Sequence, residues 1–347
     1  MTKAVLFSCQ GPDLLPEEAA FFKDAQPLGF ILFERNCKSR EQVKKLVDDL
    51  KATVDHSFVP ILIDQEGGRV VRLKPPEWRA AYPASIFGQL AEHDLTLAGQ
   101  CAFWQASLIG QELADLGINV NCAPCVDLFM PDADPIIGDR AFSDQIPIIR
   151  HLSLQTMKGL QSQGVIPIIK HLPGHGRAPV DSHKELPIVE TPLETLEATD
   201  FLAFQEICQQ VKLEGPQPMP WGMTAHVVYN AVDSLHPATH STKAIQNVIR
   251  QWIGFEGFLI SDCLTMEALE GSFTVRTEKA LQAGCDAVLY CKSNLSEMKE
   301  VANVALPLSS NAYERLQGSL LPTVETLSPV QQQDYQERLK HHLLLIS

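Results

Sequence analysis

Eight short apolar runs alternate with amphipathic stretches along this chain, and this alternation restricts the fold more than any other feature. The apolar runs are continuous, which is typical of parallel strands that are covered on both faces. The pattern predicts strands over residues 4–8, 29–33, 59–63, 118–123, 165–169, 222–225, 257–261 and 287–290. It predicts helices over 39–53, 93–116, 145–162, 194–210, 241–252 and 273–283, with Ser39 as the first N-cap.

Eight strands in β-α alternation are the number found in a (β/α)8 TIM barrel, and a doubly wound open sheet is the alternative. Polar residues follow nearly every predicted strand: Glu34-Arg35, Asp64-Gln65-Glu66, Asp127, Lys170-His171, His226 and Asp262. In a barrel all these strand ends meet at one rim, where barrel enzymes carry their catalytic residues. The barrel is therefore preferred.

We expect one α/β domain over residues 1–347, with irregular early strands. The barrel is expected over about 3–292 and a helical extension over about 293–347. An extended, proline-rich connection is predicted over 215–220, and a closing helix over 328–346.

Charge and hydropathy exclude two classes of partner. The 347 residues include 28 Lys and Arg against 42 Asp and Glu, a formal net charge of −14 at pH 7, so we expect no nucleic-acid partner. No apolar run approaches the roughly 18 residues of a membrane span, and residues 4–7 are too short for a secretory signal. Nine cysteines without framework spacing fit a reducing compartment. We therefore expect a cytoplasmic protein that has no membrane partner and acts as a monomer.

The segment 170–183 follows a predicted buried strand and carries the densest set of reactive side chains. It reads Lys-His-Leu-Pro-Gly-His-Gly-Arg-Ala-Pro-Val-Asp-Ser-His, and its proline and glycines predict a loop at the rim. Asp181 and His183 lie two residues apart, so in an extended segment the carboxylate can hold the imidazole, which can then give and take a proton. A surface pair without function is the alternative. His175 is expected to anchor the loop through its ring nitrogens.

Two patterns raise the possibility of a metal or redox site, and we favour neither. His171, His175 and His183 could bind zinc, but His-x3-His spacing suits a helix, and the proline and glycines argue against one. Cys122-Ala-Pro-Cys125 has Cys-x-x-Cys spacing, yet a single copy fits buried thiols better. No metal or cofactor is expected.

Carboxylates at two predicted strand ends are candidates for chemistry on a sugar. Asp262 precedes residues 263–267, which are predicted to open a helix, so it is either a catalytic group at the rim or an N-cap. The glycines of Asp64-Gln-Glu-Gly-Gly-Arg69 suggest a phosphate-binding loop, but the two acidic residues argue against an anion. Carboxylates accept hydrogen bonds from vicinal hydroxyls, so a sugar-binding segment is preferred.

Six motifs follow one another along the chain, most of them at predicted strand ends. They are Ile-Asp-Gln-Glu-Gly-Gly-Arg-Val-Val-Arg (63–72), Asn-Cys-Ala-Pro-Cys-Val-Asp (121–127), Gly-Asp-Arg-Ala-Phe (138–142), Lys-His-Leu-Pro-Gly-His-Gly with Asp-Ser-His (170–183), Met-Thr-Ala-His (223–226) and Ser-Asp-Cys-Leu-Thr-Met-Glu (261–267). In this combination they resemble glycoside hydrolase family 3, and more narrowly its single-domain bacterial β-N-acetylglucosaminidases (β-N-acetylhexosaminidases) of peptidoglycan recycling. The similarity covers roughly residues 3–292.

The resemblance implies a role for each matching residue. It assigns Asp262 as the nucleophile and His183, supported by Asp181, as the general acid/base. The residues that correspond to those holding the N-acetylglucosamine unit are Asp64, Arg72, Arg140, Lys170 and His171. Larger family members use a glutamate acid/base from a second domain, which this chain lacks, consistent with the Asp-His pair taking its place.

The implied activity is a retaining, two-step hydrolysis of terminal β-linked N-acetylglucosamine from muropeptides that carry an anhydro-N-acetylmuramic unit. The chain departs from the family pattern at Leu172, where an aromatic residue is usual, at Cys122 and Cys125, and at Cys263, where a second aspartate is common. These differences bear on substrate preference more than on the reaction. A phosphorylase on the same scaffold and a non-catalytic sugar-binding relative are the alternatives.

Overall fold

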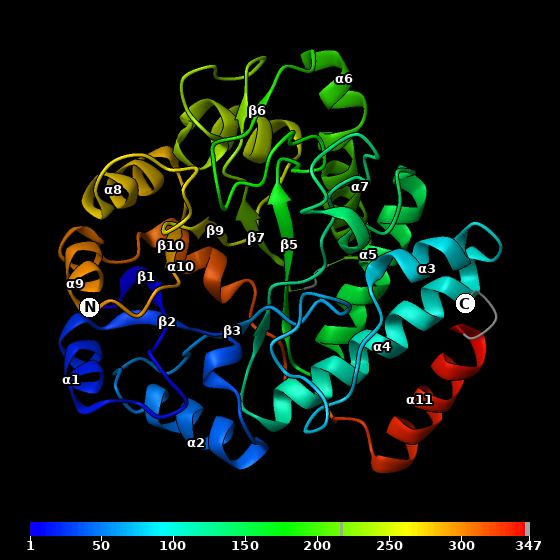
Figure 1. Ribbon diagram of the computed structural model, residues 1–347, viewed down its shortest axis with the longest axis horizontal. Coiled ribbons are helices and arrows are strands. Elements are labelled where there is room, and N and C mark those ends of the chain that lie inside the picture. Colours follow the sequence, from blue (N-terminus) through cyan, green and yellow to red (C-terminus); the bar gives the residue numbers. More distant parts are fainter. Residues whose placement is uncertain (216–217, 344–347) are drawn as a thin grey trace.

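A closed barrel of parallel strands forms the centre of the protein, in a computed structural model that describes residues 1–215 and 218–343 (Figure 1). The strand order around the barrel is β1-β10-β9-β7-β5-β4-β3-β2. Its strands are β1 (Lys3–Phe7), β2 (Pro27–Leu32), β3 (Ile61–Ile63), β4 (Val120–Asn121), β5 (Ile166–Leu172), β7 (Trp221–Thr224), β9 (Leu259–Cys263) and β10 (Ala287–Tyr290). Each overlaps one of the eight predicted strands. The barrel prediction is confirmed, and the alternative of an open sheet is wrong.

Helices cover the outside of the barrel (Figure 1). They are α1 (Pro16–Ala25), α2 (Arg40–Lys51), α3 (Ala84–Ala91), α4 (Leu95–Asp115), α5 (Ile146–Gln161), α6 (Leu193–Ala198), α7 (Asp200–Leu213), the π-helix η4 (Lys243–Trp252), α8 (Phe273–Ala283), α9 (Leu295–Val304), α10 (Ser310–Gln317) and α11 (Pro329–Leu343). Ser39 caps α2 as predicted, because its side chain accepts a hydrogen bond from the Gln42 N–H. The helix predicted over 194–210 is divided at Thr199 into α6 and α7.

Two predicted segments extend past the described residues. The closing helix predicted over 328–346 is α11, and positions 344–346 lie outside the part that the structure describes. Positions 216–217 of the connection predicted over 215–220 lie outside it as well. Within residues 1–215 and 218–343, no helix combines the length and apolar character that crossing a membrane requires.

The early strands are irregular, as predicted, and side chains complete their pairing. β3 has three residues and β4 has two. Asn119 accepts a hydrogen bond from the Ile61 N–H at 2.7 Å. Asn121 exchanges two hydrogen bonds of 3.0 Å with the backbone of Gln65. These amides satisfy backbone groups that a longer β4 would have paired, and they hold the start of the Asp64-Gln65-Glu66 segment in place.

Alternate residues of the strands pack into two buried layers. Val5 and Phe7 of β1 belong to the layer that includes residues of α1, α2, α4, α5 and α7, which is the outer one. Leu6 belongs to a second cluster built almost entirely from strand residues, the barrel interior. Ala312 and Leu316 of α10 also belong to this interior cluster, so α10 closes one end of the barrel. Burial on both faces explains why the strand sequences are continuously apolar.

A two-stranded sheet of β6 (Ile188–Val189) and β8 (Val228–Tyr229) lies beyond the carboxyl ends of β5 and β7. β6 follows the 170–183 loop in sequence, and in Figure 1 it lies past the arrowhead of β5. The functional site described below opens at this same end of the barrel, and β2, β5, β7, β9 and β10 all contribute residues that line it.

The close contact between α4 and α5 depends on Gly159. A Cβ atom at this position would lie 2.6 Å from the Phe103 carbonyl oxygen and 2.7 Å from the Ala106 Cβ atom. We expect Gly159→Ala to lower the free energy of unfolding by about 1–3 kcal/mol, because the helices must separate. Urea titration followed by circular dichroism measures this change. Gly318→Ala is the control, since a Cβ atom there meets nothing closer than 3.4 Å; equal stability of the two variants would contradict the packing argument.

Candidate active site

A cavity of about 310 Å³ opens at the carboxyl ends of the barrel strands. Seven of the eight predicted site residues line it: Asp64, Arg72, Arg140, Lys170, His171, His183 and Asp262. The eighth, Asp181, joins them through its hydrogen bonds to His183. Residues separated by nearly 200 positions in sequence therefore face one space because the strand ends converge.

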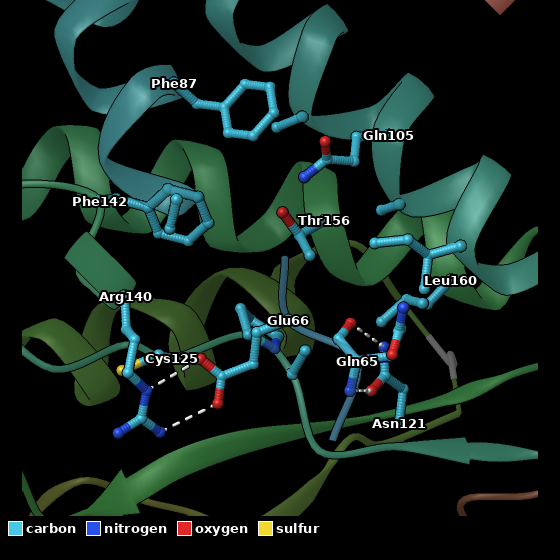
Figure 2. A pocket seen from close by; sticks show the side chains of 16 residues that line it. Gln65, Glu66, Phe87, Gln105, Asn121, Cys125, Arg140, Phe142, Thr156 and Leu160 are labelled. Atoms are coloured by element: carbon cyan, nitrogen blue, oxygen red, sulfur yellow. Dashed lines mark hydrogen bonds and ion pairs between the residues drawn. The ribbon is translucent and has the colours of Figure 1, made fainter. Parts of the chain in front are cut away.

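Five charged side chains form a continuous chain of ion pairs on one wall of the cavity, here called the charge chain: Arg72, Asp64, Lys170, Glu66 and Arg140. Lys170 is 2% exposed and lies at its centre, with its Nζ atom 3.1 Å from Asp64 and 2.6 Å from Glu66. Arg72 contacts the other oxygen of Asp64 at 2.9 Å. Arg140 donates two hydrogen bonds of 2.9 and 3.0 Å to Glu66, and Figure 2 shows the two groups facing each other.

The charge chain keeps its members ionised despite their burial. Burial alone would raise the pKa of Asp64, but the charges of Lys170 and Arg72 hold that pKa well below its ordinary range. Burial likewise opposes ionisation of Glu66, and the charges of Arg140 and Lys170 lower its pKa to about 2. The same carboxylates raise the pKa of Lys170. The wall therefore presents fixed charges that can accept hydrogen bonds from sugar hydroxyls and donate to them.

His171 is oriented by a buried carboxylate that was expected at the rim but was not assigned a role. Asp127 accepts a hydrogen bond from the His171 Nδ1 atom at 2.7 Å and from the backbone N–H of His175 at 2.6 Å. Burial opposes ionisation of Asp127, but His171 and His175 lower its pKa. Because Nδ1 donates to Asp127, the Nε2 atom of His171 is left as the ring atom for a ligand in the cavity.

Cys125, Asp127 and His171 are the group in the described residues whose ligand atoms could hold a metal ion, and these atoms lie within 4.8 Å of one another. Asp127 already accepts hydrogen bonds from the Cys125 thiol at 3.3 Å, from the His171 ring and from the His175 backbone. Burial and the nearby Asp127 charge raise the pKa of Cys125, which disfavours the thiolate that a metal needs. Hydrogen bonding thus accounts for this cluster, and Cys122 and Cys125 are buried free thiols as predicted.

Asp262 lies at the carboxyl end of β9 with its side chain in the cavity. Its Oδ1 atom accepts a hydrogen bond from the Cys263 N–H at 2.7 Å. His226 is buried next to it and bonds to the Cys263 carbonyl oxygen at 3.0 Å. Burial would raise the pKa of Asp262, yet its electrostatic interactions with His226, His171 and His183 and its hydrogen bond from the Cys263 N–H lower it. Asp262 is consequently an ionised carboxylate, as a nucleophile must be.

The prediction that a helix begins at residues 263–267 is wrong. Cys263 still pairs with Leu289 as part of the sheet, and turns follow over 264–269. The next helix, α8, begins at Phe273, and Ser272 is its N-cap. The alternative in which Asp262 serves as a helix cap is therefore wrong as well.

Asp181 and His183 contact each other as predicted, but in a turn and not in an extended segment. Asp181 Oδ1 accepts hydrogen bonds from the backbone N–H and the Nδ1 atom of His183, at 2.9 and 2.8 Å. The side chain of His183 is 59% exposed, against 13% for Asp181. Burial opposes ionisation of Asp181, but its hydrogen bonds to His183 lower its pKa. The carboxylate thus fixes the ring and leaves Nε2 free to exchange protons.

The first half of the 170–183 loop is buried and packed against its surroundings. His175 anchors the loop through one ring nitrogen, since Nε2 contacts the Ser182 hydroxyl at 3.0 Å and Nδ1 has no partner. The Tyr229 hydroxyl donates a hydrogen bond to the Gly174 carbonyl oxygen. A Cβ atom at Gly176 would lie 2.3 Å from the Leu128 carbonyl oxygen. The glycines in this half of the loop are explained by close packing.

Three residues of the site were expected at the rim but were not assigned individual roles: Glu66, Asp127 and His226. All three follow predicted strands, and this position was the signal available in the sequence. Each of them acts by contacting a residue on or after another strand. Glu66, for example, binds Arg140, which is 74 positions away in the sequence.

Lys170→Met tests the charge chain through its effect on acid stability. The pKa of Glu66 lies at about 2 in the folded protein, below the roughly 4.3 of an unfolded chain. The stability from its ionised form is therefore complete above about pH 4.3 and is lost as the pH falls toward 2. Without Lys170 the pKa of Glu66 is lowered less, so we expect stability to decline at a higher pH than in wild type.

Urea titrations between pH 7 and pH 3 measure the acid dependence of unfolding. The matched control is Lys45→Met, which removes an exposed ion pair with Asp49 and should leave the acid dependence unchanged. An identical acid profile for Lys170→Met and wild type would show that Lys170 does not maintain the carboxylates.

Comparisons with known proteins agree with this geometry. Residues 13–316 match the family model for the glycosyl hydrolase family 3 N terminal domain. The chain is 33% identical over 305 residues to a Beta-hexosaminidase from Mannheimia succiniciproducens, covering 87% of this chain and 84% of the relative. The crystal structure of native NagZ from Neisseria gonorrhoeae superposes with a TM-score of 0.85 at 30% identity, covering 100% of this chain and 98% of that one. A complex of the same NagZ with N-trifluoroacetyl-D-glucosamine gives the same TM-score and identity. The chain therefore belongs to glycosyl hydrolase family 3.

Proposed function

We propose that this glycoside hydrolase is an exo-β-N-acetylglucosaminidase that releases terminal β-linked N-acetylglucosamine with retention of configuration. One observation carries the proposal: an ionised carboxylate, Asp262, and a carboxylate-oriented histidine, His183, line the same cavity. The names of the relatives support the sugar class, since one is a Beta-hexosaminidase and another was crystallised with an N-acylglucosamine analogue.

The charge chain and His171 bind the non-reducing sugar in this proposal. Asp64, Arg72, Arg140, Lys170 and His171 all line the cavity and offer charged donors and acceptors at fixed positions. Hydrogen bonds between charged groups and sugar hydroxyls fix the ring, so that its anomeric carbon lies against Asp262. Glu66 belongs to the same wall and is added to this set because it shares Lys170 with Asp64.

The reaction proceeds in two steps through a glycosyl-enzyme. In the first, an Asp262 carboxylate oxygen bonds to the anomeric carbon while the bond to the leaving oxygen breaks, and protonated His183 Nε2 gives that oxygen its proton. In the second, His183 takes a proton from water, whose oxygen bonds to the anomeric carbon and displaces Asp262. Asp181 stays hydrogen-bonded to Nδ1 and compensates the positive charge of the ring.

The use of histidine in place of a second carboxylate suggests an anionic leaving group. The anhydro-N-acetylmuramic unit carries a lactyl carboxylate when no peptide is attached, and in a muropeptide, where that group is an amide, the peptide carries its own carboxylates. A carboxylate base would repel such an anionic leaving group. A neutral imidazole would not. We therefore propose such muropeptides of peptidoglycan recycling as the substrate, and a monomeric, cytoplasmic enzyme whose whole chain forms one catalytic domain. Nine free cysteines, most of them buried, support a reducing compartment.

Azide distinguishes the two catalytic roles. We expect Asp262→Gly to lose at least about 10³-fold in kcat on an aryl N-acetyl-β-glucosaminide, and azide to restore turnover with an α-glycosyl azide as product. We expect His183→Ala to lose about 10²–10⁴-fold on substrates with poor leaving groups, and azide to yield a β-glycosyl azide. Product configuration by NMR checks both assignments.

The matched control is His236→Ala, because His236 also faces a carboxylate, Asp233, at 3.5 Å but is not among the residues that line the cavity. It should retain wild-type turnover. A β-azide from Asp262→Gly would contradict the nucleophile assignment. Formation of a sugar 1-phosphate when phosphate is added would instead identify a phosphorylase.

His183→Glu tests the electrostatic explanation for the histidine. With a neutral aryl leaving group, the glutamate can still act as acid and base, so we expect partial activity. With a disaccharide that ends in anhydro-N-acetylmuramic acid, we expect a further loss in kcat/KM, because two carboxylates would face each other. Equal losses on the two substrates would refute this explanation while leaving the role of His183 intact.

A further inference from the structure

Two free cysteines lie side by side on the cavity wall, next to the proposed nucleophile. Cys263 ends β9 and Cys291 directly follows β10, and these strands are neighbours in the barrel. Both residues line the cavity, and Cys291 is partly exposed. The proposed hydrolysis uses neither thiol.

The surroundings of Cys263 favour its thiolate. The Thr265 hydroxyl lies 3.1 Å from the Cys263 sulfur, and the Thr265 N–H points to it at 3.5 Å. The Cys291 thiol, on the neighbouring strand, interacts with the same sulfur, and this interaction also lowers the pKa of Cys263. Burial and the Asp262 charge raise the pKa of Cys263, but these hydrogen-bonding interactions outweigh both and lower the pKa below its ordinary value. The other eight cysteines, all in the described part of the chain, have raised pKa values.

The backbone of Cys263 holds the catalytic carboxylate in position. Its N–H donates to Asp262 at 2.7 Å, and its carbonyl oxygen is bonded to His226 at 3.0 Å. On the other strand, Arg35 donates a hydrogen bond of 2.7 Å to the Cys291 carbonyl oxygen. A covalent change at the two sulfur atoms would therefore act on the position of Asp262.

We propose that Cys263 and Cys291 form a modification site for hydroperoxides, at which oxidation joins the two sulfur atoms in a disulfide. The Cys263 thiolate attacks one oxygen of hydrogen peroxide, breaking the O–O bond, and the other oxygen leaves as water after taking up a proton. The resulting sulfenic acid is attacked by the Cys291 sulfur, which loses its proton, and a second water leaves. Two thiols are oxidised and one peroxide is reduced to two waters.

The disulfide changes the geometry at Asp262. The two sulfur atoms, on neighbouring strands, must approach to about 2.05 Å, which draws the ends of β9 and β10 together. A displacement of about 1 Å in a catalytic group costs about 10²-fold in rate. We expect a loss of this size in glycosidase activity, and reducing agents should reverse it. The activity readout rests on the proposed function, whereas the disulfide itself does not.

The test exposes the purified full-length protein to a small excess of hydrogen peroxide. Mass spectrometry of a non-reduced digest should show the peptides of Cys263 and Cys291 linked, with a mass lower by two hydrogens. Activity should fall by about 10²-fold and return with dithiothreitol. Absence of the linked peptide at a peroxide concentration that inactivates the enzyme would overturn the proposal. A linked peptide in a protein without glycosidase activity would overturn only the proposed function.

Three variants separate this pair from other oxidation. Each is compared with its own untreated activity. Cys291→Ser should stop at the sulfenic acid, which dimedone labels at Cys263, and Cys263→Ser should resist peroxide. Cys37→Ser is the matched control, because Cys37 is also a partly exposed free thiol, and it should inactivate as wild type does. Unchanged peroxide sensitivity in Cys263→Ser would refute the site; if this variant does not fold, loss of the linked peptide in Cys291→Ser tests the same bond.

Discussion

The site depends on one buried cation, Lys170, which lies between two carboxylates. A lysine that is 2% exposed can remain charged only with close opposite charges, and Asp64 and Glu66 supply them at 3.1 and 2.6 Å. Each carboxylate in turn needs its own arginine, and this requirement extends the network to loops that follow β3 and β4. The barrel brings the strand ends close together, and the ion pairs of the charge chain fix the positions of the loops that follow them. The side chains proposed to bind the sugar are therefore the same ones that anchor these loops.

Two Asp-His pairs in the site show how burial assigns different tasks to the same residues. Asp127 and His171 are both buried, so their ring orientation is fixed and the pair can only hold or polarise what it touches. Asp181 and His183 have nearly the same hydrogen-bond length, 2.8 Å against 2.7 Å, but the second ring is mostly exposed. Exposure leaves the second imidazole accessible to water, as the acid/base role proposed for it requires. Sequence spacing alone does not separate these tasks.

The barrel was predictable because strands buried on both faces need continuous apolar sequence, and this chain has eight such runs. The cavity residues were predictable from motifs at the strand ends. Glu66, Asp127 and His226 were expected at the rim, but their individual roles were not predicted because their partners lie on other strands and local sequence patterns do not show contacts between strands. The prediction of a helix at residues 263–267 was wrong for a related reason. Aspartate is a common N-cap residue, but Cys263 after Asp262 continues the strand pairing with β10. The next helix, α8, is capped by Ser272 instead.

The position of α10 has a consequence for the order in which the protein can fold. Ala312 and Leu316 fill part of the barrel interior, and the Ser319 hydroxyl accepts a hydrogen bond of 2.8 Å from the buried Trp221 indole. The eighth strand ends at Tyr290, so all eight strands are synthesised before the residues that cover the interior. During synthesis, a nascent chain with all eight strands still exposes apolar side chains at that end of the barrel. Until residues 312–319 leave the ribosome, this opening is a site where chaperones can bind and where incomplete chains can associate.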